Sequence, residues 1–327
     1  MDTIRIGLVG CGSYGISHLE AFASIPGVEI AAAFDVDRIR AESAAGQFSI
    51  PRVCGSLEEI CGMDELQAID VVTTETAHYE PVMAAIAMGK HVFVEKPLAT
   101  NLGECARMID AARAAERILM VGLLLRFETK YALIKRELDS GRLGTIVSMH
   151  ARRNRPKSLL PVYGRTHPVL ENSIHDVDLM LWYTGQAVVC VRGYGRKATG
   201  GKHDDTFWGI LEFADGSIGV IETIWLLPEA AGVQLDDAFQ LFGTRGVANL
   251  ELFPGPLCFW REAGSDVPDV SYTSILRDEL VYFCECVRTG RQLEIITAVE
   301  AMRAVRVSLA LIESARIGRD VKIEEWN

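Results

Sequence analysis

Lys96 follows an apolar stretch in HVFVEKPLAT, residues 91–100. Residues 91–94 predict a buried strand, and Pro97 restricts Lys96 to an extended backbone. A parallel strand presents its carboxyl end to the ligand crevice, so an ammonium there can stabilise negative charge that develops on a substrate oxygen. Glu95 is a candidate to hold that ammonium. The plainer alternative is a solvated loop lysine.

His175 is a second candidate for chemistry. In VLENSIHDVDLMLW, Glu171 precedes His175 by four residues, which places both side chains on one face of a predicted helix. An imidazole with an ordinary pKa of about 6.5 can take a hydroxyl proton at neutral pH, and a carboxylate beside it can fix the tautomer. The alternative is a histidine that packs on the helix or caps it. Asp176 is a weaker candidate, for substrate contact.

A glycine-rich turn, GLVGCGSYGISH, joins the first predicted strand to the first predicted helix. Its Gly-x-Gly-x-x-Gly pattern allows a tight turn and close approach of the backbone to a pyrophosphate. Asp35 ends the next strand, where a carboxylate would accept hydrogen bonds from an adenosine ribose and repel the extra phosphate of NADP. NAD is therefore favoured, although Arg38 keeps NADP open. The alternative is a plain glycine turn and a capping aspartate. The cofactor candidates here are Gly10, Gly12, Ser13, Tyr14, Gly15 and Asp35.

A basic segment, HARRNRPKSLLPVYGRTHP, interrupts an otherwise acidic chain. Arg155, Tyr163 and His167 lie in its proline-rich part, which predicts a loop, and binding residues concentrate in loops. Arginines there would suit a carboxylate or phosphate on the substrate. A charged rim or subunit contact is an equal alternative.

Composition narrows the classes of function. The 327 residues carry a net charge of -11, which disfavours nucleic acid and anionic membranes as partners. No apolar run approaches the roughly 18 residues that would cross a bilayer, and we expect a cytoplasmic protein. The eight cysteines form no C-x-x-C pair, so neither disulfides nor a metal site is expected.

The first 122 residues alternate short apolar runs with helical patterns. Runs apolar on both faces predict parallel strands covered by helices, at residues 4–9, 29–34, 68–74, 91–94 and 118–122. Helices are expected at residues 13–25 and 77–88 and from Asn101 onward. This alternation predicts a doubly wound α/β domain over residues 1–122 that binds a dinucleotide.

Residues 123–327 do not continue the regular alternation of strands and helices. Helices are predicted at 128–139, 171–183, 274–289 and 297–316, and a strand at 145–153. Hairpin turns at Asp215-Gly216 and at residues 243–246 predict antiparallel strands. We expect an α+β domain with a large open antiparallel sheet, which binds substrate and contacts other subunits. The last helix could instead pack back on the first domain.

Five segments resemble the Gfo/Idh/MocA family of NAD(P)-dependent sugar and cyclitol dehydrogenases: GCGSYG, FDVD, AIAMGKHVFVEKPLA, VGLLLRF and SIHDVDLMLWYTG. The resemblance implies a Rossmann domain followed by an open-sheet domain through which dimers or tetramers form. It implies Lys96 at the nicotinamide and His175 as the catalytic histidine. It also suggests cofactor contacts for Thr73, His78 and Glu95, and a substrate contact or a bracing role for Arg126.

Three positions depart from the family pattern. Thr73-Thr74-Glu75 stands where Thr-Pro-Asn is common, Leu125 where asparagine is frequent, and Glu171 where many members have aspartate. The sequence predicts hydride transfer between NAD and a secondary hydroxyl of a sugar, cyclitol or sugar acid. Two alternatives remain open, a non-catalytic NAD-binding sensor and a redox-assisted glycoside-cleaving enzyme.

Overall fold

The structure is a computed structural model that describes residues 3–232, 235–252, 255–261, 264–270 and 273–325. Contacts between residues divide it into two compact units. The first unit comprises residues 1–127 with 273–302, and the second comprises residues 128–272 with 303–327.

A six-stranded parallel sheet forms the centre of the first unit, in the order β3-β2-β1-β4-β5-β6. The strands are β1 (Ile4–Val9), β2 (Val28–Phe34), β3 (Arg52–Val53), β4 (Ala68–Val71), β5 (His91–Glu95) and β6 (Leu119–Gly122). Every residue of β4 and β6 is buried, as expected for strands covered on both faces. The strand order reverses between β1 and β4, so their carboxyl ends mark the ligand crevice.

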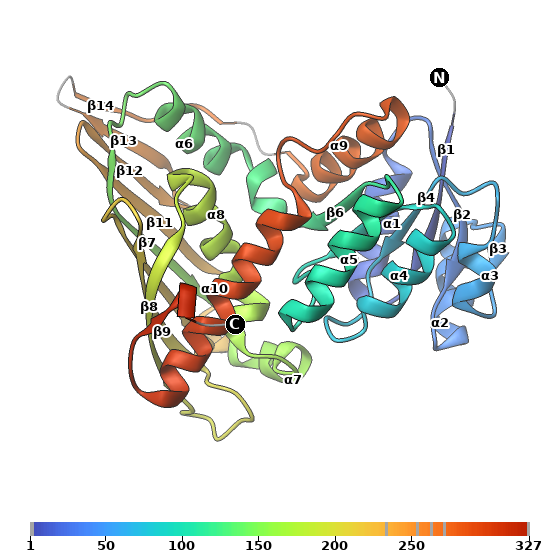
Figure 1. Ribbon diagram of the computed structural model, residues 1–327, viewed down its shortest axis with the longest axis horizontal. Coiled ribbons are helices and arrows are strands. Elements are labelled where there is room, and N and C mark those ends of the chain that lie inside the picture. Colours follow the sequence, from blue (N-terminus) through green and yellow to red (C-terminus); the bar gives the residue numbers. More distant parts are fainter. Residues whose placement is uncertain (1–2, 233–234, 253–254, 262–263, 271–272, 326–327) are drawn as a thin grey trace. The chain divides into compact units, whose positions relative to one another are not determined.

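Helices pack on this sheet (Figure 1). They are α1 (Ser13–Ala23), α2 (Arg38–Phe48), α3 (Leu57–Cys61), α4 (Tyr79–Ala87), α5 (Leu102–Ala114) and α9 (Ile275–Thr289). The pairs α3 with α4 and α4 with α5 lie side by side, while α1 packs beside α2 and α9. A 3₁₀ turn, Leu124–Phe127, follows β6. This arrangement is the doubly wound, or Rossmann, architecture that the alternating pattern predicts.

A nine-stranded sheet dominates the second unit, in the order β14-β13-β12-β11-β7-β10-β9-β8-β15. Its strands are β7 (Ile146–Asn154), β8 (Val188–Arg196), β9 (Thr206–Phe213), β10 (Ile218–Ile224), β11 (Asp236–Gly243), β12 (Gly246–Glu251), β13 (Leu257–Arg261), β14 (Gly264–Asp266) and β15 (Val321–Lys322). The sheet is mixed, because β7 and β10 pair in parallel while the other neighbours are antiparallel. The large antiparallel sheet expected from the sequence is therefore present, with one parallel pair within it.

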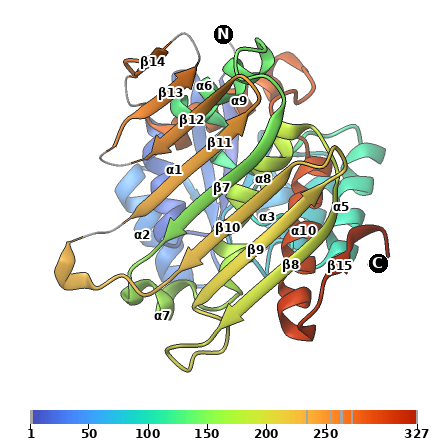
Figure 2. The same cartoon turned by 90° about the vertical axis from the view of Figure 1, so that its left-hand side faces the viewer.

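The helices of the second unit are α6 (Thr129–Asp139), α7 (Leu160–Tyr163), α8 (Ile174–Thr184) and α10 (Ala298–Ile317), and α10 begins within the first unit. Figure 2 looks onto the sheet face that has no helix in front of it. Strand β9 alternates strictly between buried and exposed residues, so one face belongs to the core and the other is open. No described helix is long and apolar enough to cross a membrane.

Candidate active site

The glycines of the turn after β1 fall into two groups: two that the fold requires and one with open space around it. Gly10 has a φ of 103°, and a Cβ added to it would lie 2.5 Å from the carbonyl oxygen of Val72. A Cβ on Gly15 would lie 2.2 Å from the carbonyl oxygen of Gly10. The fold itself therefore requires these two glycines. Around a Cβ built on Gly12, by contrast, no described atom outside the turn lies within 4 Å.

Gly12 is also the N-cap of α1, and the cap makes no side-chain hydrogen bond. The first turn of this fully described helix carries no acidic side chain, so no carboxylate of that turn offsets the positive end of the helix dipole. Ser13 and Tyr14 are the first residues of that turn, and both are at least partly exposed. Open space at Gly12 and a helix start without a capping side chain fit the pyrophosphate of a dinucleotide.

Asp35 follows β2 and is partly exposed. Its Oδ2 accepts the backbone N–H of Cys11 at 2.7 Å, and its Oδ1 accepts that of Asp37 at 2.8 Å. Each oxygen keeps a second lone pair for a ribose hydroxyl. A direct hydrogen bond thus joins the glycine turn to Asp35 and holds the carboxylate in a fixed position relative to the turn.

Lys96 is partly exposed at the end of β5, between two buried neighbours. Its backbone N–H donates to Oε2 of Glu95 at 3.1 Å. His78 Nδ1 donates to the carbonyl of Pro97 at 2.8 Å, and its Nε2 lies 3.3 Å from the carbonyl of Thr73. Side chains from β5 and from the loop after β4 therefore hold the backbone around Lys96.

Two expected cofactor contacts are buried instead. Glu95 is 5% exposed and His78 is 1% exposed, and burial lowers the pKa of His78 below its ordinary value. We therefore remove both from the proposed cofactor contacts and assign them to the support of Lys96. Thr73 keeps partial exposure and stays a candidate. The unusual Glu75 is 4% exposed, so its carboxylate is not presented to a ligand on the surface.

His175 and Glu171 occupy different kinds of helix. Glu171 lies in a π-helical turn, Val169–Ser173, and His175 lies in the first turn of α8. The chain is helical over residues 171–183 as predicted, but its beginning is π-helical, so the four-residue spacing no longer fixes a common face. Both side chains are partly exposed and remain candidates. Single π-turns inside helices frequently occur at functional sites.

Asp176 belongs to a buried charge cluster of Arg153, Asp176 and Asp237. Asp176 is 1% exposed, and it accepts from Arg153 Nη2 at 2.8 Å and Nε at 3.0 Å. Arg153 Nη1 donates to Asp237 at 2.9 Å. Burial disfavours the charged guanidinium, but Asp176 and Asp237 outweigh it and raise the pKa of Arg153. We remove Asp176 from the proposed substrate contacts because its carboxylate is engaged by Arg153.

Of the three substrate-contact candidates in the basic segment, two are engaged within the protein or buried, and one is partly exposed. Arg155 donates to Asp237 and to the carbonyl of Asn154, so its charge is used within the protein. His167 is 7% exposed, and burial, which outweighs the attraction of Asp204, lowers its pKa to about 4. Both leave the proposed substrate contacts. Tyr163 is partly exposed, with its ring against Trp225, and it stays.

Arg126 braces the first unit. It is 3% exposed and donates to the carbonyl of Ile295 at 2.7 Å and to Glu300 at 3.0 Å. Of the two roles left open for Arg126, the contacts favour bracing, so we remove it from the substrate contacts. The unusual Leu125 is 5% exposed and packs in the interior.

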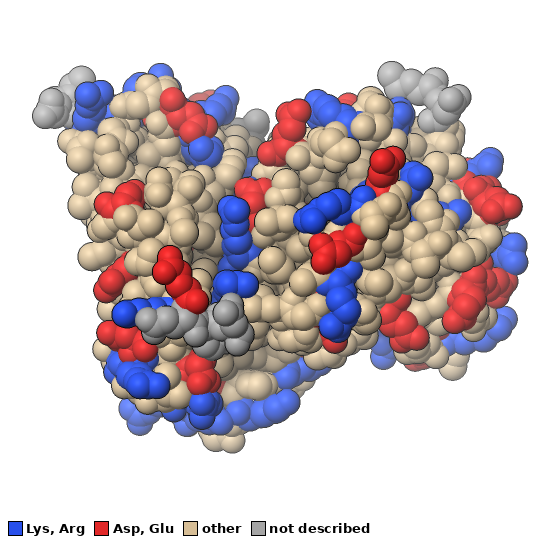
Figure 3. Space-filling model, in the orientation of Figure 1, with Lys and Arg blue, Asp and Glu red and all other residues tan. Residues whose placement is uncertain are grey.

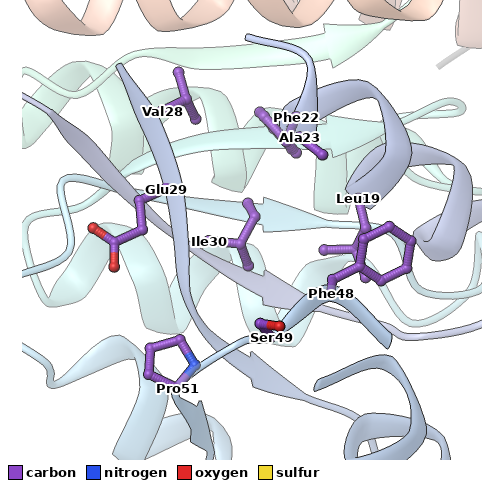
Figure 4. Close-up of a pocket in the computed structure, with 9 residues that line it drawn as sticks. All are labelled: Leu19, Phe22, Ala23, Val28, Glu29, Ile30, Phe48, Ser49 and Pro51. Atoms are coloured by element: carbon purple, nitrogen blue, oxygen red, sulfur yellow. The ribbon is translucent and has the colours of Figure 1, made fainter. Parts of the chain in front are cut away.

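One hollow in the described part of the first unit lies apart from the candidate site residues. It measures about 220 Å³ and is lined by residues of α1 and β2 and by residues at the end of α2 and just after it (Figure 4). Glu29 is its one charged lining residue and pairs with Arg5 at 3.3 Å. No predicted site residue lines it. Among the described residues, no group of three His, Cys, Asp or Glu side chains is placed to hold a metal.

Comparisons with known proteins address the same two regions. Residues 4–123 match the family described as "Oxidoreductase family, NAD-binding Rossmann fold", and residues 131–249 match the "GFO/IDH/MocA C-terminal domain". Inositol 2-dehydrogenase 2 of Saccharopolyspora erythraea is 27% identical and covers 98% of this chain and 96% of its own. Inositol 2-dehydrogenase of Acidothermus cellulolyticus is 34% identical, over 55% of this chain and 53% of its own.

A solved structure shares the fold over the whole length. Scyllo-inositol dehydrogenase from Lactobacillus casei, with bound NAD(H) and scyllo-inositol, superposes with a TM-score of 0.87 at 20% identity, covering 99% of this chain and 100% of its own. The family matches cover the whole six-stranded sheet and, in the nine-stranded sheet, strands β7 to β11 and part of β12. The chain belongs to the Gfo/Idh/MocA family of NAD-dependent oxidoreductases.

Proposed function

We propose that this protein oxidises one secondary hydroxyl of a cyclitol or related sugar with NAD, and reduces the ketone in reverse. The observation that carries the proposal is the hydrogen bond between the glycine turn and Asp35, together with the open space at Gly12. The names of its inositol dehydrogenase relatives support a cyclitol as the substrate class.

Two side chains have the chemistry that this reaction needs. In the oxidation, the carbon bearing the hydroxyl loses a hydride and the hydroxyl loses its proton, which leaves a ketone. His175 accepts that proton, and Glu171 orients its imidazole. Lys96 stabilises the negative charge that builds on the oxygen. NAD, when bound, supplies the acceptor for the hydride.

Asp35 favours NAD over NADP. Two backbone N–H groups hold its carboxylate, whose negative charge opposes a second phosphate on the ribose. Arg38, the residue that kept NADP open, donates to Glu42 at 2.8 Å. An NADP site is expected to have an arginine that can pair with the extra phosphate on the ribose. Arg38 instead pairs with the carboxylate of Glu42.

The substrate is proposed to be uncharged. Three of the four arginines of the basic segment are paired with carboxylates of the protein: Arg152 with Asp236 at 2.8 Å, and Arg153 and Arg155 with Asp237. The fourth, Arg165, donates to the carbonyl of Val162. A sugar acid or sugar phosphate needs a cation that is not already neutralised. A polyol needs only hydrogen-bonding groups, so we favour a cyclitol over a sugar acid.

A second copy of the chain is the proposed protein partner. The open sheet face exposes large apolar side chains, which monomers rarely leave uncovered: Tyr194, Trp208, Ile210, Ile218, Phe242 and Trp260. Acidic and basic side chains are interspersed over the face drawn in Figure 3, which offers no extended basic surface to nucleic acid. Dimers or tetramers through the open sheet follow from this proposal.

Sedimentation velocity tests that partner. Trp208→Lys should shift the assembly to smaller species because it places charge in the buried contact. Val36→Lys is the matched control, since Val36 is 95% exposed but belongs to the first unit. A wild type that is monomeric at micromolar concentration would contradict an oligomer.

The test of the function is a substrate panel assayed with NAD. Inositol isomers, sugars and sugar acids are incubated with enzyme and NAD, and net NADH is followed by its near-ultraviolet absorbance. We expect net NADH with at least one cyclitol and little with sugar acids. Binding of NAD without turnover would indicate a sensor, and bond cleavage without net NADH would indicate a redox-assisted glycosidase. Either result would contradict the proposal.

A pair of glycine variants tests the cofactor site separately. Gly12→Ala should leave the melting temperature nearly unchanged and weaken NAD binding by about tenfold or more, since its Cβ enters the space meant for the pyrophosphate. Gly46→Ala, in the exposed face of α2 and also with open space around it, is the control. Equal NAD affinity in Gly12→Ala and wild type would place the cofactor elsewhere.

A further inference from the structure

His18 lies in α1 and is completely buried between two carboxylates. Its Nδ1 lies 2.9 Å from Oδ2 of Asp70, a residue of β4, and its Nε2 lies 3.3 Å from Oε1 of Glu95, the last residue of β5. Asp70 is 0% exposed and Glu95 is 5% exposed. One imidazole therefore links the helix of the glycine turn to two neighbouring strands of the sheet.

The protonation state follows from the partners. A neutral imidazole carries one N–H, whereas the imidazolium donates from both nitrogens. Carboxylates face both nitrogens of His18. Nδ1 is hydrogen-bonded to Asp70, whereas Nε2 lies at ion-pair distance from Glu95 without an aligned hydrogen bond. The imidazolium is the form that both negative charges favour. The surroundings are apolar, with the rings of Tyr14, Phe22 and Phe93 meeting the imidazole edge to face. Low polarity strengthens the attraction between the ring and the carboxylates.

Glu95 is fixed from its other sides as well. A Cβ added to Gly122, the residue opposite Glu95 in β6, would lie 2.5 Å from Oε1 of Glu95. The carboxylate thus fills the space that glycine leaves. Its Oε2 accepts the backbone N–H of Lys96 at 3.1 Å. The contacts run from His18 to the Glu95 carboxylate and from there to the Lys96 backbone.

We propose that His18, as an imidazolium, is a positioning residue that holds the Glu95 carboxylate and through it the backbone of Lys96. The proposal rests on the catalytic role proposed for Lys96. The signal was present in the glycine motif, since His18 ends the quoted stretch GLVGCGSYGISH. Its function could not be read there, because both partners lie far along the chain.

The electrostatics agree with this geometry. Burial by itself lowers the pKa of His18, but the charge and hydrogen bond of Asp70, with Glu95, outweigh it and raise the pKa to about 10. The titratable groups around the cluster are Tyr14 from α1, Asp70 from β4, Glu95 from β5 and Cys284 from α9. Burial raises the pKa of Cys284 to about 12, so this thiol stays neutral beside them.

The first experiment is a double-mutant cycle between His18→Gln and Lys96→Ala. Gln can still donate toward Glu95 but carries no charge, so kcat should fall about 10- to 100-fold through misplacement of Lys96. KM for NAD should change less than about twofold. In the Lys96→Ala background, His18→Gln should have no further effect, because the residue through which it acts is gone.

The control is His91→Gln, at the opposite end of β5, where Nδ1 accepts the backbone N–H of Ile118 at 3.0 Å. This change should leave kcat within about twofold of wild type. The proposal is overturned if His18→Gln lowers kcat by the same factor with and without Lys96, since a purely structural role would act in both backgrounds.

The second experiment needs no substrate. Nitrogen NMR of histidine-labelled wild type at about pH 8 should show one histidine with both nitrogens protonated, and His18→Asn should remove that signal. A neutral His18 at this pH would overturn the proposal even if the enzyme is active. Conversely, an enzyme inactive on every cyclitol but with a doubly protonated His18 would disprove the proposed function and leave the His18 assignment standing.

Discussion

Each unit places a buried charge cluster directly beside a proposed catalytic residue. In the first unit, the cluster consists of His18, Asp70 and Glu95, and Glu95 immediately precedes Lys96 in the chain. In the second unit, the cluster of Arg153, Asp176 and Asp237 includes the residue that follows His175. Both clusters tie a helix to strands of a sheet, so both give the neighbouring side chain a rigid base.

The clusters differ in the cation that holds them together. An imidazolium can lose its proton within an accessible pH range, whereas a guanidinium cannot. The first cluster also has one cation for two carboxylates, while Arg155 supplies a second cation to Asp237 in the other. The same mechanical task is therefore done once by a titratable group and once by permanent charges. We expect only the first cluster to lose its cation as the pH rises.

Removing the lysine tests what the first cluster supports, and the effect should be the largest. Lys96→Ala is expected to lower turnover about 10³- to 10⁴-fold, since the ammonium acts on charge that develops only in the transition state. NAD affinity, measured by calorimetry, should change little. Lys135→Ala, at a partly exposed lysine of α6 that pairs with Asp139, is the control. Wild-type turnover in Lys96→Ala would end the assignment.

Breaking the second cluster should be the next largest effect. Arg153→Met leaves Asp176 and Asp237 buried without their cation, which should lower the free energy of unfolding by about 3–5 kcal/mol. Arg152→Met is the matched control one residue earlier, where the pair with Asp236 is partly exposed and contributes at most about 1 kcal/mol. Chemical denaturation measures both. If both variants lose a similar amount of unfolding free energy, the buried cluster stabilises the fold no more than the exposed pair does.

The pH dependence of stability separates the clusters most sharply. The pKa of His18 in the folded protein, about 10, lies above its ordinary value of 6.5, so its pairing stabilises the fold fully below about pH 6.5. That contribution is lost as the pH rises toward 10. The stability difference between wild type and His18→Gln should shrink by about 2 kcal/mol from pH 7 to 9.

The difference between wild type and Arg153→Met should stay constant over the same range, because Arg153 does not titrate there. Denaturation at several pH values provides both curves. Parallel curves for the His18 and Arg153 variants would erase the distinction between the clusters.

Asp35 lies outside both clusters and should show the smallest effect. Asp35→Ala is expected to relax the preference for NAD over NADP by about tenfold, since it removes one repulsive carboxylate. Its stability curve should keep the pH dependence of wild type. The ratio of kcat/KM for the two cofactors measures the change, and a wild type that already prefers NADP would contradict the role of Asp35.

Sequence patterns predicted the parts of the fold that depend on local periodicity. The strands β1, β2, β4, β5 and β6 and the cap of α5 at Asn101 follow from apolar runs and capping residues. The parallel pairing of β7 with β10 could not be predicted, because it depends on strands brought together from residues 146–154 and 218–224. The two-residue strand β3 carries too short a pattern to recognise.

The candidate site was predictable where a residue's role depends on its own neighbours. Gly10, Gly15 and Asp35 have the geometry expected from their motif. The burial of Asp176 and the pairing of Arg155 could not be foreseen, since they depend on contacts with Arg153 and Asp237, which lie 84 residues apart in the chain. The charges that looked available in the sequence are neutralised by partners that only the fold brings near.

Isotope transfer tests the central claim most directly. Inositol deuterated at its ring carbons is incubated with the enzyme and NAD, and the cofactor is analysed by mass spectrometry. The account predicts one deuterium in the nicotinamide ring for each ketone formed, and at least about 10³-fold slower transfer in Lys96→Ala. Bound NAD that gains no deuterium from any inositol, sugar or sugar acid would contradict it.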